Sequence, residues 1–226
     1  MTLRPPATRY DAVILDYNGV IGLQPKTSDW ERLATLAGWP LDRIAAFQDA
    51  FWNRRPGYDS GAFTNTEFWS SGLLLRTDRP LMDLLPELIE ADMAMWTTVD
   101  PAVIHLLRAA HRAGTKFVLL SNAPAALSEA LDMTEWSCSL MASSVYSCGI
   151  GINKPAKQAY EAALAAAGWP DPERVLFVDD RAENTAAAGR LGMNTLHYTG
   201  NLGALAAHLP QLYPAPAVQQ VGAAVA

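Results

Sequence analysis

The residues that decide the fold read AVILDYNGV and occupy positions 12–20. The four consecutive apolar residues from Ala12 to Leu15 predict a strand buried on both faces, which is typical of a parallel sheet covered by helices. Asp16 follows this strand directly, and Gly19 lies just beyond it. Ligands of open α/β sheets bind at the carboxyl ends of the strands, so Asp16 stands where a reactive carboxylate is expected.

Other apolar runs predict further strands of the same sheet, and helical stretches separate them. One helix begins with the capping pair Asp100 and Pro101, and each predicted helix is followed by a glycine that ends it. The predicted strands are 12–15, 117–120, 175–178 and 195–198, with a weaker one at 140–145, and the predicted helices are 101–113, 155–167 and 182–191. This alternation predicts an α/β fold with a Rossmann-like, doubly wound parallel sheet.

The segment from Gln24 to Trp96 breaks the alternation, because its Trp, Leu, Ala and charged residues recur at helical spacing and form no convincing strand. We therefore expect a helical unit over 23–97, inserted into a core formed by 10–22 and 98–210. The segments 1–9 and 213–226 are expected to be flexible tails.

Composition restricts the classes of function. A net charge of -6 and a pI near 5.2 argue against a surface for nucleic acid or anionic lipid. No apolar run is long enough to cross a membrane and the first residues do not resemble a signal peptide, which predicts a cytoplasmic protein without a membrane partner. Cys138 and Cys148 are not spaced like a zinc site or a redox pair. The sequence does not indicate the oligomeric state.

A second acidic pair, Asp179 and Asp180, follows the strand 175–178 in the way that Asp16 follows the first. Each of these residues alone is typical of a turn or a helix cap, but neighbouring parallel strands would bring the three carboxylates together. Carboxylates at such close range repel one another unless a cation or a proton lies between them. Mg²⁺, which prefers oxygen ligands, is the expected cation.

Two more strand ends carry polar side chains. Ser121 and Asn122 follow the strand 117–120, and Lys154 precedes a helix. Taken singly, these residues are typical of a loop and of a surface charge. Together, a hydroxyl, exposed N–H groups and a lysine are suited to bind a phosphoryl group, so the expected partner is a small phosphorylated substrate.

The order of these four motifs resembles the haloacid dehalogenase-like hydrolase superfamily over residues 10–200, and in particular its subfamily I type A with a helical C1 cap. The fourth motif looks most like that of small sugar-phosphate phosphatases. The resemblance implies that Asp16 is a nucleophile that forms an aspartyl-phosphate. It also implies that Mg²⁺ is held by Asp16, the backbone carbonyl of Asn18, Asp180 and, close by, Asp179. Phosphoryl oxygens would be bound by Ser121, Lys154 and the N–H groups of Gly19 and Asn122.

Asn18 departs from the pattern of that superfamily, in which most phosphatases carry an acid–base aspartate at this position. A carboxamide cannot exchange a proton at neutral pH, so a contribution of roughly 10²–10⁴-fold to the rate is missing unless another group supplies it. The expected function is a Mg²⁺-dependent phosphatase acting on a small phosphate monoester, such as a sugar phosphate, a nucleotide or a biosynthetic intermediate. The alternatives are a catalytically impaired phosphate-binding or regulatory protein, or a different reaction on the same scaffold.

Substrate choice is expected to come from the inserted helical unit. Arg55 and Tyr58 match positions that recur in relatives with this type of cap, and Arg55 is suited to pair with a second anionic group or a sugar hydroxyl. The tryptophans of this segment are more typical of a helix-bundle core than of a ligand platform.

Overall fold

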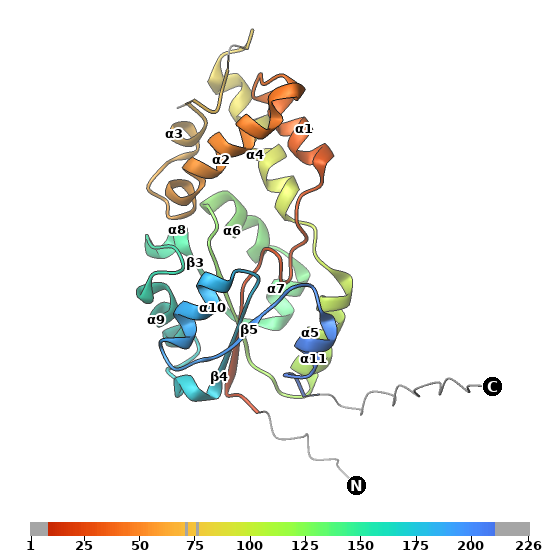
Figure 1. The fold of residues 1–226 in the computed structure, drawn as a ribbon, viewed down its shortest axis with the longest axis vertical. Helices are drawn as coiled ribbons and strands as arrows, with labels where there is room; N and C mark the ends of the chain where they lie inside the picture. The colour runs from red at the N-terminus through yellow and green to blue at the C-terminus, as the bar shows by residue number, and fades with distance from the viewer. Residues whose placement is uncertain (1–8, 71, 76, 211–226) are drawn as a thin grey trace, which may run out of the picture.

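The computed structural model describes residues 9–70, 72–75 and 77–210. It contains a five-stranded, all-parallel sheet in the order β3-β2-β1-β4-β5 (Figure 1). The strands are β1 (Ala12–Leu15), β2 (Phe117–Ser121), β3 (Met141–Tyr146), β4 (Val175–Asp179) and β5 (Asn194–His197). The predicted α/β fold is confirmed, and so are all five predicted strands, with ends that differ by one residue at most.

Helices cover both faces of this sheet. Alternate residues of β1 point to opposite faces: Ile14 joins a core shared with Tyr160 and Ala188, whereas Leu15 joins the core on the other side. The helices of the first face are α9 (Lys157–Ala166) and α10 (Ala182–Gly189), and those of the second are α5 (Pro101–Arg112), α6 (Ala125–Asp132), α7 (Glu135–Leu140) and α11 (Leu202–Ala206). This double cover explains why the strand residues form continuous apolar runs.

The predicted helices are present, although α9 begins two residues later than the pattern 155–167 suggested, at Lys157. The short helices α6, α7 and α8 (Ser147–Ile150) were not predicted. Each spans eight residues or fewer, which is too short for helical periodicity to show. No described helix is long and apolar enough to span a membrane.

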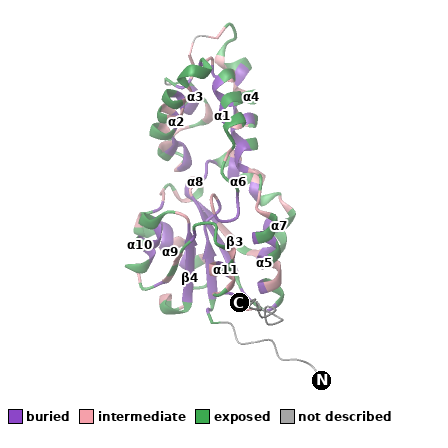
Figure 2. Cartoon of the chain, turned by 45° about the vertical axis from the view of Figure 1, so that its right-hand side comes forward, coloured by how far each residue is buried: buried purple, intermediate pink, exposed green. Residues whose placement is uncertain are grey.

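Four helices form a separate layer beyond the carboxyl edge of the sheet, here called the cap (Figure 1). They are α1 (Thr27–Leu36), α2 (Ile44–Asp59), α3 (Asn65–Ser70) and α4 (Leu81–Trp96). Aromatic rings fill the space between them: Trp30 meets Phe51 edge to face at 5.2 Å, and Tyr58 stacks on Phe68 at 4.1 Å. Figure 2 shows this buried interior as purple segments on the facing sides of the cap helices.

Two chain segments connect the cap to the sheet, and they run side by side. The N–H of Leu23 donates to the carbonyl of Thr98, and the N–H of Asp100 donates to the carbonyl of Ile21, both at 2.8 Å. The hydroxyl of Tyr17, the second residue after β1, donates to the carbonyl of Trp96 at the end of α4. The predicted tails lie almost entirely outside the described residues.

Candidate active site

Three carboxylates meet at the carboxyl edge of the sheet, because β1 and β4 are neighbours: Asp16 follows β1 directly, and Asp179 ends β4. One oxygen from each of Asp16, Asp179 and Asp180 lies within 4.8 Å of the others. Asp16 and Asp179 are buried, and Asp180 is half-buried. The sequence prediction that these three residues converge is therefore matched by the geometry of the strands.

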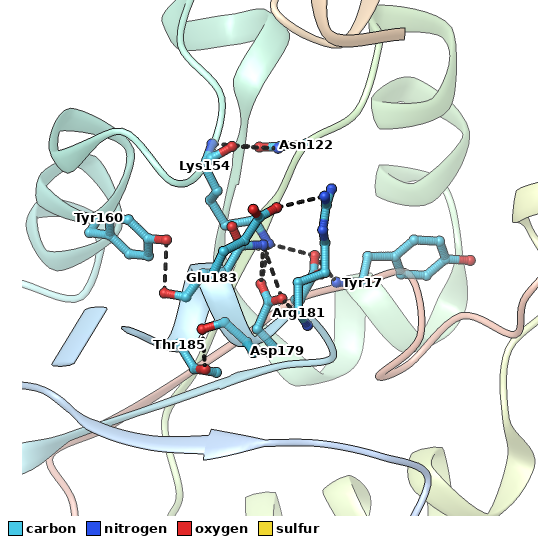
Figure 3. Close-up of polar contacts among 11 residues, drawn as sticks. Tyr17, Asn122, Lys154, Tyr160, Asp179, Arg181, Glu183 and Thr185 are labelled. Carbon is cyan, nitrogen blue, oxygen red and sulfur yellow. Dashed lines mark hydrogen bonds and ion pairs between the residues drawn. The ribbon is translucent and has the colours of Figure 1, made fainter. Parts of the chain in front are cut away.

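Lys154 links two of the carboxylates (Figure 3). Its Nζ lies 2.7 Å from Asp16 Oδ1 and 2.7 Å from Asp179 Oδ2, and its side chain is 1% exposed. The Asn122 side chain holds the backbone of this lysine from both sides: Oδ1 accepts from the Lys154 N–H at 2.8 Å, and Nδ2 donates to its carbonyl at 3.0 Å. Asn122 thus positions the loop that delivers the ammonium group.

Asp179 is surrounded by donors. Asn184 Nδ2 lies 3.0 Å from each of its oxygens, and the N–H of Arg181 donates to Oδ1 at 2.9 Å. With Lys154 on Oδ2, both oxygens of this carboxylate are bound within the protein. Asp179 therefore serves to hold Lys154, whereas Asp16 and Asp180 are better placed to bind an added ion.

Burial disfavours charge on these groups. It raises the pKa of Asp16 to about 7, although the Lys154 ammonium acts in the opposite direction. Burial, together with the charge of Asp179, also raises the pKa of Asp180. For Lys154, burial lowers the pKa, but Asp16 and Asp179 outweigh this effect and raise it. Full ionisation of the carboxyl groups therefore needs more positive charge than Lys154 alone supplies.

These residues fit a divalent cation. When ionised, three carboxylates face one ammonium group, and carboxylate oxygens are the ligands that Mg²⁺ prefers. Gly19 leaves room for this arrangement: a Cβ at this position would lie 2.2 Å from Asp180 Oδ2, and φ is +79°. The glycine thus allows the backbone after Asp16 to approach Asp180 closely.

Four polar atoms at this edge are buried without a hydrogen-bond partner in the described part of the chain, namely Asn18 Oδ1, Ser121 Oγ, Asn153 Oδ1 and Asn184 Oδ1. A buried hydroxyl left unpaired is costly unless a ligand completes it. Ser121 ends β2, beside β1, so its position agrees with a role in binding. Gly19 differs from the expectation, because its N–H donates to the carbonyl of Gly22 at 2.8 Å and is not free to bind a phosphoryl oxygen in this conformation.

A cavity of about 650 Å³ lies between the carboxyl edge of the sheet and the cap. The core side contributes Asp16, Asn18, Asn122, Asn153, Lys154, Pro155, Asp180, Arg181, Glu183 and Asn184, and the cap side contributes Gln24, Trp52, Arg55, Pro56, Asp59 and Trp96. The carboxyl edge of the sheet and the cap therefore face one cavity.

Arg55 lines this cavity but is 3% exposed and bonded to two carboxylates. Its Nε lies 2.7 Å from Asp59 Oδ1, and its Nη1 lies 3.0 Å from Asp92 Oδ1. The guanidinium is therefore neutralised within the cap, which disagrees with the idea that it pairs with a second anionic group of a substrate. Tyr58 is 2% exposed, its hydroxyl donates to Asn65 Oδ1, and it is not among the cavity-lining residues.

Sequence reasoning named Arg55 but not the other residues of α2 that line the cavity. These are Trp52, Pro56 and Asp59, which lie three or four residues apart along the helix. That spacing forms one face of a helix and was the available signal. Asn153 was missed as well, because nothing in the sequence shows that its side chain reaches the carbonyl of Pro56 in the cap.

Fold and site together define an α/β protein with a carboxylate-rich centre beneath a helical cap. A family model described as haloacid dehalogenase-like hydrolase matches residues 10–192, which include β1 to β4 and every residue of the core side of the site. The chain belongs to this family of hydrolases and is an enzyme. A comparison with curated proteins found no match.

Solved structures with the same fold include a HAD phosphatase and dehalogenases. The HAD family enzyme bt-2542 from Bacteroides thetaiotaomicron, crystallised with magnesium and inorganic phosphate, is 18% identical, with a TM-score of 0.62 over 82% of this chain and 92% of that one. The L-2-haloacid dehalogenase RSc1362 is 19% identical, with a TM-score of 0.61 over 92% and 90% of the two chains. A HAD phosphatase from Thermococcus onnurineus is 18% identical, with a TM-score of 0.56 over 81% and 84%. At these identities the likeness shows the fold alone.

Proposed function

We propose that this hydrolase is a Mg²⁺-dependent phosphatase that acts on a small phosphate monoester and uses Asp16 as its nucleophile. The observation that carries the proposal is the convergence of Asp16, Asp179 and Asp180 around the buried Lys154 ammonium. A centre with this charge pattern suits a cation together with a phosphoryl group. The magnesium and phosphate bound by the bt-2542 enzyme, which has the same fold, support this reading.

In the proposed reaction, a carboxylate oxygen of Asp16 attacks phosphorus while the bond to the ester oxygen breaks. Water then attacks the phosphorus of the aspartyl-phosphate, which releases phosphate and restores the Asp16 carboxylate. Lys154 and Ser121 bind and neutralise the phosphoryl oxygens during both steps. Asp16, Asp180 and the Asn18 carbonyl would hold Mg²⁺, which would offset phosphoryl charge when bound.

A second candidate function follows from Asn18. Without an acid–base group in this position, the protein would bind phosphate esters without turning them over, or would run a different reaction of the family. A haloacid dehalogenase needs no acid to protonate its leaving group, but the pair Asp179 and Asp180 favours a metal-dependent phosphatase. We therefore rank the phosphatase first.

The test is phosphate release from a panel of sugar phosphates, nucleotides and p-nitrophenyl phosphate. We expect release by the native chain in Mg²⁺ that is lost with EDTA, restored by Mg²⁺ and reduced by roughly 10³-fold or more in Asp16→Asn, because the nucleophile is removed.

Circular dichroism of Asp16→Asn provides the control for folding. If no ester, including the aryl ester, releases phosphate, the protein is not a phosphatase. Mg²⁺-dependent binding of inorganic phosphate without turnover would then establish the binding protein instead, and release of halide from 2-haloacids would establish the dehalogenase.

A further inference from the structure

The cavity face of helix α2 presents a carboxyl group that the reaction described above does not use. Asp59 lies at the end of this helix, on the same face as Trp52, Arg55 and Pro56, and lines the cavity opposite Lys154 and Asp16. Its side chain is 11% exposed. It is thus a nearly buried carboxyl group whose open part faces the space where a substrate would lie.

The two oxygens of Asp59 are not equivalent. Oδ1 accepts from Arg55 Nε at 2.7 Å, which fixes the orientation of the carboxyl group. Oδ2 has no hydrogen-bond partner among the described residues. It keeps some accessible surface, because it is not one of the fully buried polar atoms that lack a partner. The free oxygen is therefore open to the cavity, and it can carry a proton without breaking the bond to Arg55.

Asp59 belongs to the cap, but its backbone is fixed to the core beside Lys154. The Ser147 hydroxyl donates to the Asp59 carbonyl at 2.5 Å, and Asn153 Nδ2 donates to the Pro56 carbonyl at 2.7 Å. Asn153 is the residue before Lys154, so the end of α2 is joined to the loop that delivers the ammonium group. These contacts hold Asp59 over the reacting edge of the sheet.

We propose that Asp59 is the general acid and base of this enzyme and takes the part that Asn18 cannot play. The proposal rests on the phosphatase function proposed above. As Asp16 attacks phosphorus and the ester bond breaks, the leaving oxygen takes the proton from Asp59 Oδ2 and departs as an alcohol. The Asp59 carboxylate then takes a proton from the water that attacks the aspartyl-phosphate. Phosphate and the Asp16 carboxylate are released, and Asp59 is protonated again.

The surroundings of Asp59 suit an acid that keeps its proton to a higher pH than an ordinary aspartate. Burial raises its pKa to about 6, against the lowering effect of Arg55, while Asp92 raises it further. Arg55 shares its charge between the carboxylates of Asp59 and Asp92. When Asp59 carries a proton, the three side chains together are neutral. The titratable and charged side chains on the surrounding elements are Arg55 and Tyr58 on α2, Asp92 on α4, Cys148 on α8, and Asp16, Lys154, Asp180, Arg181 and Glu183 across the cavity.

The experiment compares Asp59→Asn with Asp92→Asn, because both variants remove a carboxylate from Arg55 but only Asp59 lines the cavity. For each variant, kcat/KM is measured on p-nitrophenyl phosphate, whose leaving group needs little protonation, and on the alkyl phosphate that the native chain hydrolyses best. We expect Asp59→Asn to lose roughly 100-fold or more on the alkyl ester and far less on the aryl ester. Asp92→Asn is expected to lower kcat/KM for the aryl ester and for the alkyl ester by the same factor.

Two further readouts separate a catalytic from a structural role. Asp59→Asn should show a burst of nitrophenolate before steady state, because the aspartyl-phosphate forms but lacks the base that activates water. Asn18→Asp, introduced into Asp59→Asn, should restore part of the alkyl ester activity. Equal losses on both esters in Asp59→Asn, matching those of Asp92→Asn, would overturn the role of Asp59 and leave the phosphatase proposal intact.

The native chain tests the proposal even if neither variant folds. Across a series of aryl and alkyl phosphates, kcat/KM should depend only weakly on the pKa of the leaving alcohol, and kcat/KM for the alkyl ester should fall as the pH rises above about 6. A steep dependence on the leaving group, with no such pH effect, would show that no acid assists. Absence of phosphate release from every ester would overturn both this proposal and the proposed function.

Discussion

Gly19 has no side chain, and the position of Asp180 depends on this. An added Cβ would lie 2.2 Å from Asp180 Oδ2 and 2.5 Å from its Cγ, and φ of +79° is strained for any residue with a side chain. Gly19→Ala is therefore expected to displace Asp180 and to weaken Mg²⁺ binding by at least about 10-fold. Isothermal titration calorimetry with Mg²⁺ measures this effect directly.

Gly114 provides the matched control. It also has a positive φ, +95°, but a Cβ there would meet no atom within 4 Å. Both alanine variants should lose about 1–2 kcal/mol of unfolding free energy from backbone strain, as measured in urea. Only Gly19→Ala should lose Mg²⁺ affinity, and equal affinities for the two variants would contradict the assignment of Asp180 as a ligand.

For single residues, the sequence predicted the positions of candidate site residues well where these residues end or follow a strand. Asp16, Ser121, Asp179 and Asp180 are all found at the predicted edge, because strand residues are identified by local apolar runs. Arg55 shows the limit of this reasoning. Asp59 lies one helical turn away, but the second partner, Asp92, lies 37 residues away on another helix, and no local pattern reveals that contact.

Among the elements, helix α5 has the clearest local signal for its start. Asp100 Oδ1 accepts from the N–H of Ala102 at 2.8 Å, and Pro101 occupies the first turn. Asp100→Ala removes this acceptor and is expected to cost about 1 kcal/mol of unfolding free energy. Urea denaturation followed by circular dichroism measures the loss.

Asp100→Asn is the conservative control, since asparagine caps a helix about as well as aspartate. The asparagine variant should therefore lose no more than a few tenths of a kcal/mol. If both variants lost the same free energy, the cap would not account for the effect. The hydrogen bond from the N–H of Asp100 to the carbonyl of Ile21 would remain in both, because it uses only the backbone.

Helix α2 shows how an element can be predicted while its function is not. Its residues recur at helical spacing, and the sequence alone favours a buried helix of the cap. The face that carries Trp52 and Asp59 becomes a wall of the active site only because α2 ends against the loop before Lys154. That contact joins segments about a hundred residues apart and is invisible to local periodicity.

For the whole molecule, one contact joins the two ends of the described chain. The Tyr10 hydroxyl lies 3.0 Å from His208 Nδ1, which connects the residue before β1 to the segment after α11. Burial, and to a smaller extent the charge of Arg9, lowers the pKa of His208 below its ordinary value of 6.5. The folded protein therefore favours the neutral imidazole.

The stability of the fold should follow this shift. The pKa of His208 is lower in the folded protein than in the unfolded chain. Between these two pKa values the unfolded chain binds the proton more tightly, so the unfolding free energy falls as the pH falls. The contribution is complete above pH 6.5 and is lost as the pH falls through the lower folded-state pKa. Urea denaturation at pH 7 and pH 5 is expected to show a smaller loss for His208→Gln than for the native chain. An identical loss would mean that His208 is not a source of this pH dependence.

The sequence by itself determined the five-stranded α/β fold and the identity of the acidic centre. Both rest on local signals: apolar runs define the buried strands, and the residue after each strand must lie at the carboxyl edge. The pairing of β1 with β4, which the structure shows, then places Asp16 beside Asp179 and Asp180.

Only the tertiary structure decided how those residues are connected and what faces them. The Lys154 ammonium bridges two strand ends, Arg55 is neutralised by Asp59 and Asp92, and the free oxygen of Asp59 is turned toward the cavity. Apart from the pair of Arg55 and Asp59, which lies within α2, these arrangements depend on contacts between segments distant in the chain. The geometry of such contacts is set by packing rather than by local propensity. For this reason the sequence predicts the nucleophile, whereas the proposed source of the missing proton emerges only from the folded molecule.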